Sequence, residues 1–341
     1  MPHTAYLSAI IAAYGRHVTN LAPVQRGYRN HSYCFTTPQG DTLNLIQYKR
    51  EPGIANRIRR INWLGQSLAL SGLPVRTPAD PRIVIATGRT ITHFGLYNYL
   101  PGETIPWEAY TQAHLKLTGL ALGRLHQALA ALEAPAQMRR HSAAGQLAAL
   151  LDRMRAYFAN PAVATALAAK LHLVLNPGLI EQQADLMNRI AILPGPQLLH
   201  LDFVRSNLLF APAQPSNPLQ YEDLALTGIL DFEKAAWGAP VIDLARTLAF
   251  LLVDCQYKTP RQIRKYFVHS GYTKRGGGSA HQPCLEQLVT FFLTYDLYKF
   301  LRHNPYESLR ANQHFRRTVA QLLVRNVVSI HASNATIHHK Q

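Results

Sequence analysis

The chain has 341 residues, 48% of them hydrophobic, which is enough for one large or two ordinary domains with a filled core. Its net charge of +16 would suit a polyanionic partner, but the basic residues are scattered and no nucleic-acid-binding motif accompanies them, so we expect solvated helix faces. Three cysteines without paired spacing suggest neither a disulfide framework nor a zinc site, and no apolar run is long enough to span a membrane. We therefore expect a cytoplasmic protein without a membrane or nucleic-acid partner.

The first hundred residues predict a short helix and a small sheet. The segment 5–14 favours an amphipathic helix over a signal peptide. Short segments of alternating hydrophobicity, separated by turn signals, predict strands at residues 28–37, 42–48, 83–86 and 91–99. A helical stretch at 54–70 separates the second strand from the third. Together they predict an antiparallel sheet of about four or five strands with one helix in residues 1–100.

The rest of the chain has helical character. Apolar residues recur at helical spacing in residues 122–132, 244–252, 286–302 and 316–330. The glycine-rich segment 274–279 predicts a flexible loop, and residues 332–341 predict a frayed tail. We expect a second, larger and mainly helical domain at residues 101–331.

The residues that carry chemistry lie between His200 and Asn207 and, further along the chain, at Asp231. In a His-x-Asp-x-x-x-x-Asn loop, Asp202 is placed to accept or orient the proton of a hydroxyl group. The carboxamide of Asn207 and the carboxylate of Asp231 are oxygen ligands that suit magnesium, and Asp231 follows an apolar pair that predicts the end of a strand. Phosphoryl transfer from a nucleotide requires such a set. The alternative is that these residues only cap turns and a helix.

These two motifs resemble those of the aminoglycoside phosphotransferase and choline kinase-like family, which shares the protein kinase fold. The family's His-Gly-Asp-x-x-x-x-Asn corresponds to residues 200–207, its Ile-Asp-Phe/Trp-Glu/Asp to 230–233, and its Asp-Leu-Ala to 243–245. Residues 122–126 resemble its Leu-Gly-x-Leu-His, and residues 96–103 resemble its hinge between lobes. The resemblance runs in the family's order from about residue 22 to residue 255.

The resemblance implies an α+β, bilobal protein kinase-like fold. Residues 1–100 would form a nucleotide-binding lobe with a small antiparallel sheet and one helix. Residues 101–331 would form a larger, mainly helical lobe for catalysis and acceptor binding. The resemblance further implies an enzyme that uses ATP and magnesium to phosphorylate a hydroxyl group of a small molecule. It leaves the oligomeric state open.

The resemblance also assigns roles in catalysis. By position in the motifs, Asp202 would be the catalytic base, and Asn207 and Asp231 would hold the magnesium ion. His200 would brace the catalytic loop against Asp243, which would therefore have a structural role.

Five residues are candidates for nucleotide binding: Lys49, Gly27, Asn30, Ser32 and Tyr99. The turn at 26–32 resembles the family's Gly-x-x-Asn turn over the phosphates, although it has a single glycine. Lys49, at the end of a predicted strand, is the candidate for the lysine that contacts the phosphates, with Arg50 as a competitor. The backbone near Tyr99 would meet the base.

The chain departs from the pattern in two places. Protein kinases pair the strand lysine with a helix glutamate, but residues 52–80 contain no glutamate, and Glu51 would serve only if the helix began early. Val204 and Arg205 stand where many family members have His-Pro. Arg205 is therefore either a contact to the transferred phosphoryl group or a surface residue.

Two alternative functions remain open at this point. The missing helix glutamate would suit a catalytically weak relative that binds nucleotide and regulates a partner. The basic composition would suit a nucleic-acid-binding protein with a degenerate kinase core, whose binding would fall steeply with salt. The intact Asp202, Asn207 and Asp231 favour the enzyme.

The sequence does not name the acceptor. Aminoglycosides are polycations that need several carboxylates, but the chain has 19 acidic residues in all, and after residue 255 only Glu286, Asp296 and Glu307. A positive field also slows the capture of a cationic ligand. We therefore expect a neutral or anionic acceptor, such as a sugar or a hydroxy acid, despite the family's name.

Overall fold

The computed structural model describes residues 3–23, 25–26, 30–88, 90–213, 217–255 and 257–330. The chain divides into two compact units, each described here by itself. Unit 1 consists of Met1–Ile105, Gln127–Glu133 and Val204–Ala235, and unit 2 of Pro106–His126, Ala134–Phe203 and Ala236–Gln341. The tail expected at 332–341 lies outside the described residues, as does Gly27. No helix in the described part of the chain is both long enough and apolar enough to cross a bilayer.

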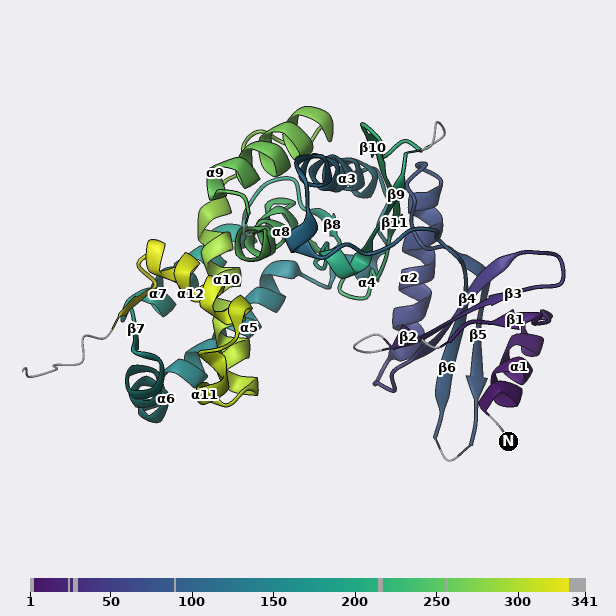
Figure 1. The fold of residues 1–341 in the computed structure, drawn as a ribbon, viewed down its shortest axis with the longest axis horizontal. Coiled ribbons are helices and arrows are strands. Elements are labelled where there is room, and N and C mark those ends of the chain that lie inside the picture. The colour runs from purple at the N-terminus through teal and green to yellow at the C-terminus, as the bar shows by residue number, and fades with distance from the viewer. Residues whose placement is uncertain are drawn as a thin grey trace, which may run out of the picture. The chain divides into compact units, whose positions relative to one another are not determined.

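Unit 1 is built around an antiparallel sheet in the order β1-β3-β4-β6-β5, with β2 pairing β3 (Figure 1). The strands are β1 (Asn20–Leu21), β2 (Gln25–Arg26), β3 (His31–Thr36), β4 (Thr42–Tyr48), β5 (Pro78–Ala86) and β6 (Thr92–Asn98). Each neighbouring pair in this sheet is antiparallel. The short alternating segments of the sequence therefore do form strands. Successive side chains of a strand point to opposite faces of the sheet, so an alternating segment places its apolar side chains on one face.

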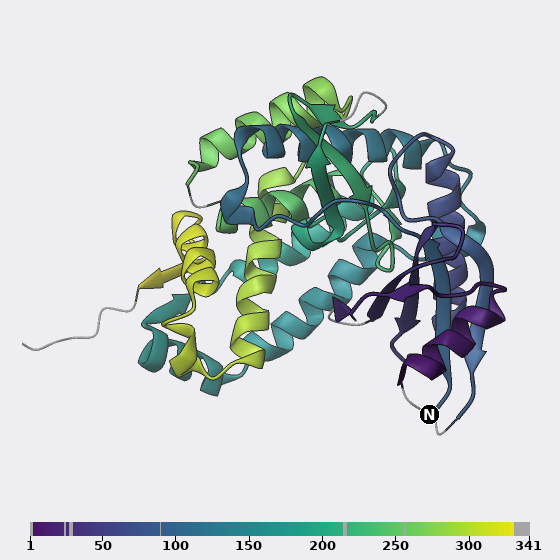
Figure 2. The ribbon, with the colours of Figure 1, turned by 45° about the vertical axis from the view of Figure 1, so that its right-hand side comes forward.

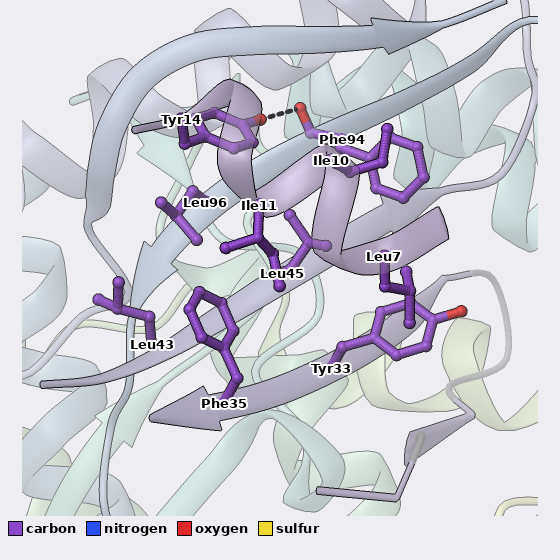
Figure 3. Packing of buried hydrophobic residues seen from close by; sticks show 10 residues of the cluster. All are labelled: Leu7, Ile10, Ile11, Tyr14, Tyr33, Phe35, Leu43, Leu45, Phe94 and Leu96. Carbon is purple, nitrogen blue, oxygen red and sulfur yellow. Dashed lines mark hydrogen bonds between the residues drawn. The ribbon is translucent and has the colours of Figure 1, made fainter. Parts of the chain in front are cut away.

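The N-terminal helix α1 (His3–Ala13) covers one face of the sheet (Figures 1 and 3). Its apolar residues Leu7, Ile10 and Ile11 recur at helical spacing, and they pack with Tyr14 against side chains of the strands. The sheet contributes Tyr33, Phe35, Leu43, Leu45, Phe94 and Leu96. The Tyr14 hydroxyl donates a hydrogen bond to the carbonyl of Phe94 (2.7 Å), and burial raises the pKa of Tyr14 to about 12. The predicted helix at 5–14 is thus part of the core.

Helix α2 (Ile54–Ala69) packs on the opposite face of the same sheet. Its residues Ile54 and Ile58 bury against Ile46, Tyr48 and Tyr97, which point away from α1 because side chains alternate along a strand. The two helices therefore enclose the sheet between two separate apolar layers.

A second small sheet belongs to the same unit. It has the order β10-β11-β9, with strands β9 (Leu208–Pro212), β10 (Gln220–Tyr221) and β11 (Leu224–Ile229). The backbones of Glu103 and Phe210 exchange two hydrogen bonds of 2.9 Å, and the N–H of Ile229 donates to the carbonyl of Pro74 (2.7 Å). These bonds tie the β9–β11 hairpin to the segments that follow β6 and α2.

Gly102 makes that connection possible. It has a φ of 116°, and a Cβ atom at this position would lie 2.4 Å from Oγ1 of Thr227 and 2.8 Å from the carbonyl oxygen of Phe210. Thr227 Oγ1 in turn donates a hydrogen bond to the carbonyl of Pro101 (2.6 Å). Only a residue without a side chain lets the chain after β6 lie so close to the hairpin.

Unit 2 is mainly helical. Its long helices are α3 (Gln112–Ala130, whose last turn belongs to unit 1), α5 (Ala143–Phe158), α7 (Leu179–Ala191), α8 (Val241–Asp254), α10 (Leu285–His303) and α12 (Gln313–Val324). Its shorter elements are η1 (Trp107–Ala109), α4 (Ala136–Arg139), α6 (Pro161–Ala166), η2 (Leu167–Leu171), β7 (Leu173–Leu175), β8 (Gln197–Leu199), β12 (Ala236–Gly238), α9 (Pro260–Ile263), η4 (Arg264–Arg275), α11 (Tyr306–Leu309) and β13 (Val328–Ile330). Helix α8 is buried almost all round, and α10 packs against both α8 and α12 (Figure 2).

Two expectations for this unit need correction. The helix expected at 316–330 ends with α12 at Val324, and the residues after it form β13, which pairs with β7. The loop expected at 274–279 begins late, since η4 continues to Arg275 and Gly276 packs against Gly123 of α3. A Cβ on Gly123 would lie 2.7 Å from Gly276, so the glycines serve close backbone packing here.

Candidate active site

The expected catalytic loop leaves strand β8 and is held by helix α8, both in unit 2. Asp243, in the first turn of α8, is almost fully buried. Its carboxylate accepts the backbone N–H groups of His200 (2.7 Å) and Leu201 (2.6 Å). One turn later, the hydroxyl of Thr247 donates to the carbonyl of Phe203 (2.8 Å). Side chains of one helix thus fix the backbone on both sides of Asp202.

The loop carries backbone strain next to Asp202. Leu201 has a φ of 57°, in the left-handed region that favours glycine, and it stands at the glycine of the family's His-Gly-Asp. The N–H of Asp202 donates to Nδ1 of His200 (3.1 Å), whose ring is fully buried. The His200 imidazole therefore accepts a hydrogen bond from the backbone of Asp202, while the Asp243 carboxylate accepts one from the backbone of His200 itself.

We expect Asp243→Ala to lower the free energy of unfolding by about 3–5 kcal/mol. The substitution leaves two buried N–H groups without an acceptor, and it removes the hydrogen bond between Asp243 and His126 (3.3 Å). Urea unfolding followed by circular dichroism measures the change. The matched control is Asp152→Ala on α5, whose exposed pair with Arg155 should contribute less than about 1 kcal/mol. Equal unfolding midpoints for the two variants would contradict the structural role of Asp243.

An arginine that sequence reasoning missed lies beside Asp202. Arg246, on α8, donates from Nη2 to Oδ1 of Asp202 (2.9 Å), and both side chains are largely buried. The Arg246 guanidinium also lies over the ring of Phe292, with Cζ 5.8 Å from the ring centre. Its Nε is buried and has no hydrogen-bond partner among the described residues. The sequence signal was its spacing, three residues after Asp243, on the same helix face.

A small pocket opens next to Arg246 within unit 2. Aromatic side chains of α8 and α10 line it together with one ion pair, and its lining residues are Arg246, Ala249, Phe250, Phe292, Tyr295, Asp296 and Lys299. Asp296 Oδ1 pairs with Lys299 (2.5 Å), and Asp296 Oδ2 contacts His314 (3.4 Å). The carboxylate in this pocket is therefore neutralised by its own neighbours.

The two expected metal ligands lie together in unit 1. Asn207 is buried in the short turn η3 (Arg205–Asn207), and its carbonyl accepts the N–H of Leu230 (2.8 Å). This bond places Asn207 beside the residue that precedes Asp231. Asp231 has a φ of 60°, a left-handed conformation that aspartate tolerates better than most residues.

Glu233 and Asn30 lie next to this pair. The side-chain amide of Asn30 donates to Glu233 (2.5 Å), while its carbonyl oxygen accepts the N–H of Lys49 (3.0 Å). Burial raises the pKa of Glu233, and the nearby Asp231 carboxylate raises it further. Asn30 thus connects the end of β4 to the segment that carries Asp231.

The donor set fits a hard divalent cation. Asn207 and Asp231 offer an amide oxygen and a carboxylate, and the repulsion between Asp231 and Glu233 would be relieved by a cation. The described residues hold no group of three or more His, Cys, Asp or Glu side chains that could bind a metal.

The other candidates lie at several places in the structure. Ser32, on β3, donates from its hydroxyl to Asn44 on β4 (2.6 Å). Lys49 is exposed just after β4, and Tyr99 is 43% exposed just after β6. Arg205 is exposed in η3. Gly27 lies outside the described residues.

Helix α2 does not begin early enough to contain Glu51. It starts at Ile54, after Gly53 in a left-handed conformation, and Glu51 forms an ion pair with Arg57 in its first turn. The residues of β4 that face α2 are the buried Ile46 and Tyr48. The face of β4 turned to α2 therefore carries no lysine at these positions.

A model of the phosphotransferase enzyme family matches residues 20–276, which is more than half of the chain. The chain belongs to this phosphotransferase family. A search of curated protein sequences gave no match.

Solved structures of this kind share its fold. An amicoumacin kinase matches with a TM-score of 0.62 at 11% identity, covering 94% of each chain. Macrolide 2′-phosphotransferase MphH from Brachybacterium faecium matches at 0.56 and 20% identity, covering 93% of this chain and 97% of its own. A microcompartment-associated aminopropanol kinase matches at 0.59 and 16% identity, covering 95% and 99%.

These matches confirm the predicted family, the protein kinase-like fold and the enzyme class. The chain is therefore a phosphotransferase. The α+β architecture, with an antiparallel sheet in the N-terminal part and helices in the C-terminal part, is also as predicted.

Proposed function

We propose that this kinase uses magnesium and ATP to phosphorylate a hydroxyl group of a small neutral or anionic molecule, such as a sugar or a hydroxy acid. The observation that carries the proposal is the loop at Asp202, whose backbone is fixed by Asp243 and whose carboxylate pairs with Arg246. The oxygen ligands Asn207 and Asp231 follow at the spacing that the family's chemistry requires.

In this mechanism, Asp202 accepts or orients the proton of the acceptor hydroxyl. Asn207 and Asp231 would hold the magnesium ion, which neutralises negative charge on the phosphates when it is bound. Asp243 and His200 keep the backbone of Asp202 in place, so the carboxylate loses little conformational entropy when it contacts the acceptor hydroxyl.

The charges near Asp202 support a neutral or anionic acceptor. Arg246 is a cation in contact with the candidate base, and its positive charge favours an anionic group over a cationic one. All three carboxylates after residue 255 already have cationic partners: Glu286 pairs with Arg264, Asp296 with Lys299, and Glu307 with Lys170. A polycationic acceptor that used these three carboxylates would have to break the pairs, whereas an anionic one would not.

A turnover screen tests this proposal. With Mg-ATP, we expect the best sugar or hydroxy acid to have a kcat/KM at least about tenfold above that of kanamycin, because like charges oppose binding of the cation. Arg246→Gln should lower kcat/KM for a hydroxy acid more than for a neutral polyol of similar size. A kcat/KM for kanamycin above that of every neutral and anionic compound would contradict the proposed acceptor class.

A further inference from the structure

The strand that should carry the phosphate-binding lysine presents none toward α2. Ile46 and Tyr48 occupy the face of β4 that packs on α2, and Lys49 is exposed after the strand ends. A nucleotide bound beside Asp231 brings several negative charges, and phosphate-binding proteins match such charge with a positioned Lys or Arg. A further cation of unit 1 near Asp231 is therefore a candidate for this contact.

Arg76 lies in the loop after α2, beside β11, the strand that leads to Asp231. Its N–H donates to the carbonyl of Ile229 (3.4 Å), and Val75 forms a parallel bridge with the same residue. On the other side, a Cβ on Gly65 of α2 would lie 2.4 Å from the Arg76 carbonyl oxygen. The loop after α2 is therefore pressed against both the helix and β11.

The side chain of Arg76 is held in place, but one of its hydrogen-bond donors has no partner among the described residues. Its guanidinium stacks on Tyr97, with Cζ 4.9 Å from the ring centre, and its Nε is buried without a hydrogen-bond partner in the described part of the chain. Burial by itself lowers the pKa of Arg76, but the hydroxyls of Tyr48 and Tyr97, and then the carboxylates of Asp231 and Glu233, raise it above its ordinary value. The group is thus a permanent cation close to the candidate metal ligand.

Neutralisation of the negative charges of Asp231 and Glu233 by Arg76 does not explain why one of its donors lacks a partner. A purely structural arginine would direct its N–H groups to acceptors, since a buried donor without a partner is unfavourable. Nε of Arg76 instead has no acceptor among the described residues, and the planar group is held by an aromatic ring. An unpaired N–H of a guanidinium is a donor that suits a phosphate oxygen.

We propose that Arg76 is a phosphate-binding residue, which contacts the phosphate oxygens of ATP in place of a lysine on β4. The proposal rests on the proposed function. The ligand class is a nucleoside di- or triphosphate, because adenosine alone offers no anionic oxygen to this group.

Isothermal titration calorimetry with adenosine and with a non-hydrolysable ATP analogue, both with magnesium, tests the contact without knowledge of the acceptor. Arg76→Met keeps an apolar stem over Tyr97 and removes the charge. We expect it to weaken binding of the analogue at least about tenfold, the loss typical of a charge-assisted hydrogen bond, while adenosine binding stays within twofold. Arg76→Lys should recover part of the loss, and Arg59→Met, on the exposed side of α2, should change neither affinity.

Four results would overturn the inference. Unchanged affinity of Arg76→Met for the analogue excludes a phosphate contact, and an equal loss for adenosine and the analogue makes the residue structural. If melting curves show that Arg76→Met does not fold, Arg76→Lys becomes the test, because lysine retains the positive charge but lacks the planar guanidinium. This variant must then lose affinity for the ATP analogue and keep its affinity for adenosine. Failure of the wild-type protein to bind the analogue with magnesium would overturn the proposed function as well, whereas the first two outcomes leave that function intact.

Discussion

Asp202→Asn should reduce phosphoryl transfer by about 10²–10⁴-fold and leave the Kd for Mg-ATP within a few-fold of the wild type. The amide has the size of the carboxylate, and its oxygen can still accept the hydrogen bond from Arg246. It cannot take a proton from a hydroxyl group. Steady-state turnover with the best acceptor measures the first effect, and calorimetry with an ATP analogue measures the second.

Asp152→Asn on α5 is the matched control, because it makes the same substitution at an exposed carboxylate, which pairs with Arg155 three residues away. It should keep wild-type turnover. Near-native turnover of Asp202→Asn, with the control also active, would mean that the loop at residues 200–207 has been misinterpreted.

Asp231→Ala should abolish the magnesium-dependent part of ATP binding. The substitution removes the carboxylate from a donor set that otherwise contains only the amide oxygen of Asn207, and a hard cation needs that charge. Calorimetric titrations of ATP with magnesium and with a chelator separate the metal-dependent part from the rest. The exposed Asp223→Ala, at the turn between β10 and β11, is the control for removal of a carboxylate from the same hairpin.

The backbone at Asp231 requires a second variant. Alanine at a φ of 60° adds strain, whereas asparagine tolerates this conformation. Asp231→Asn should therefore fold like the wild type and still lose most of the magnesium dependence. If both variants bound Mg-ATP with the wild-type Kd, the segment around Asp231 would have only a structural role.

The sheet and its helices were predictable because local patterns decided them. The strand predicted at 42–48 is β4 (Thr42–Tyr48), and the helix predicted at 54–70 is α2 (Ile54–Ala69). Strand β13 was not predictable, since Val328–Ile330 is extended only through its pairing with β7, more than a hundred residues earlier in the chain. The length of η4 depends in the same way on contact with α3.

The residues of the candidate site also differ in whether local sequence predicts them. Asp202, Asn207 and Asp231 were proposed from their spacing, because their roles demand particular residue types at particular places in the chain. Arg76 was missed, since nothing in a single sequence separates it from the other 34 lysines and arginines, of 35 in all. Arg246 was missed although its spacing, three residues after Asp243, was a signal. Their importance comes from a ring beneath Arg76 and a carboxylate beside Arg246, both supplied by other segments.

Unit 1 consists of three segments that lie far apart in the chain, which affects the order in which it can fold during synthesis. The carbonyl of Pro74 and the backbone of Glu103 find their partners only in the β9–β11 hairpin, so the first hundred residues leave the ribosome with exposed polar edges. They must wait for residue 229 before the segment around Asp231 can join them, while much of the helical part between is already made. Because such distant contacts close slowly, we expect the nascent N-terminal region to expose these polar edges until the hairpin has been made.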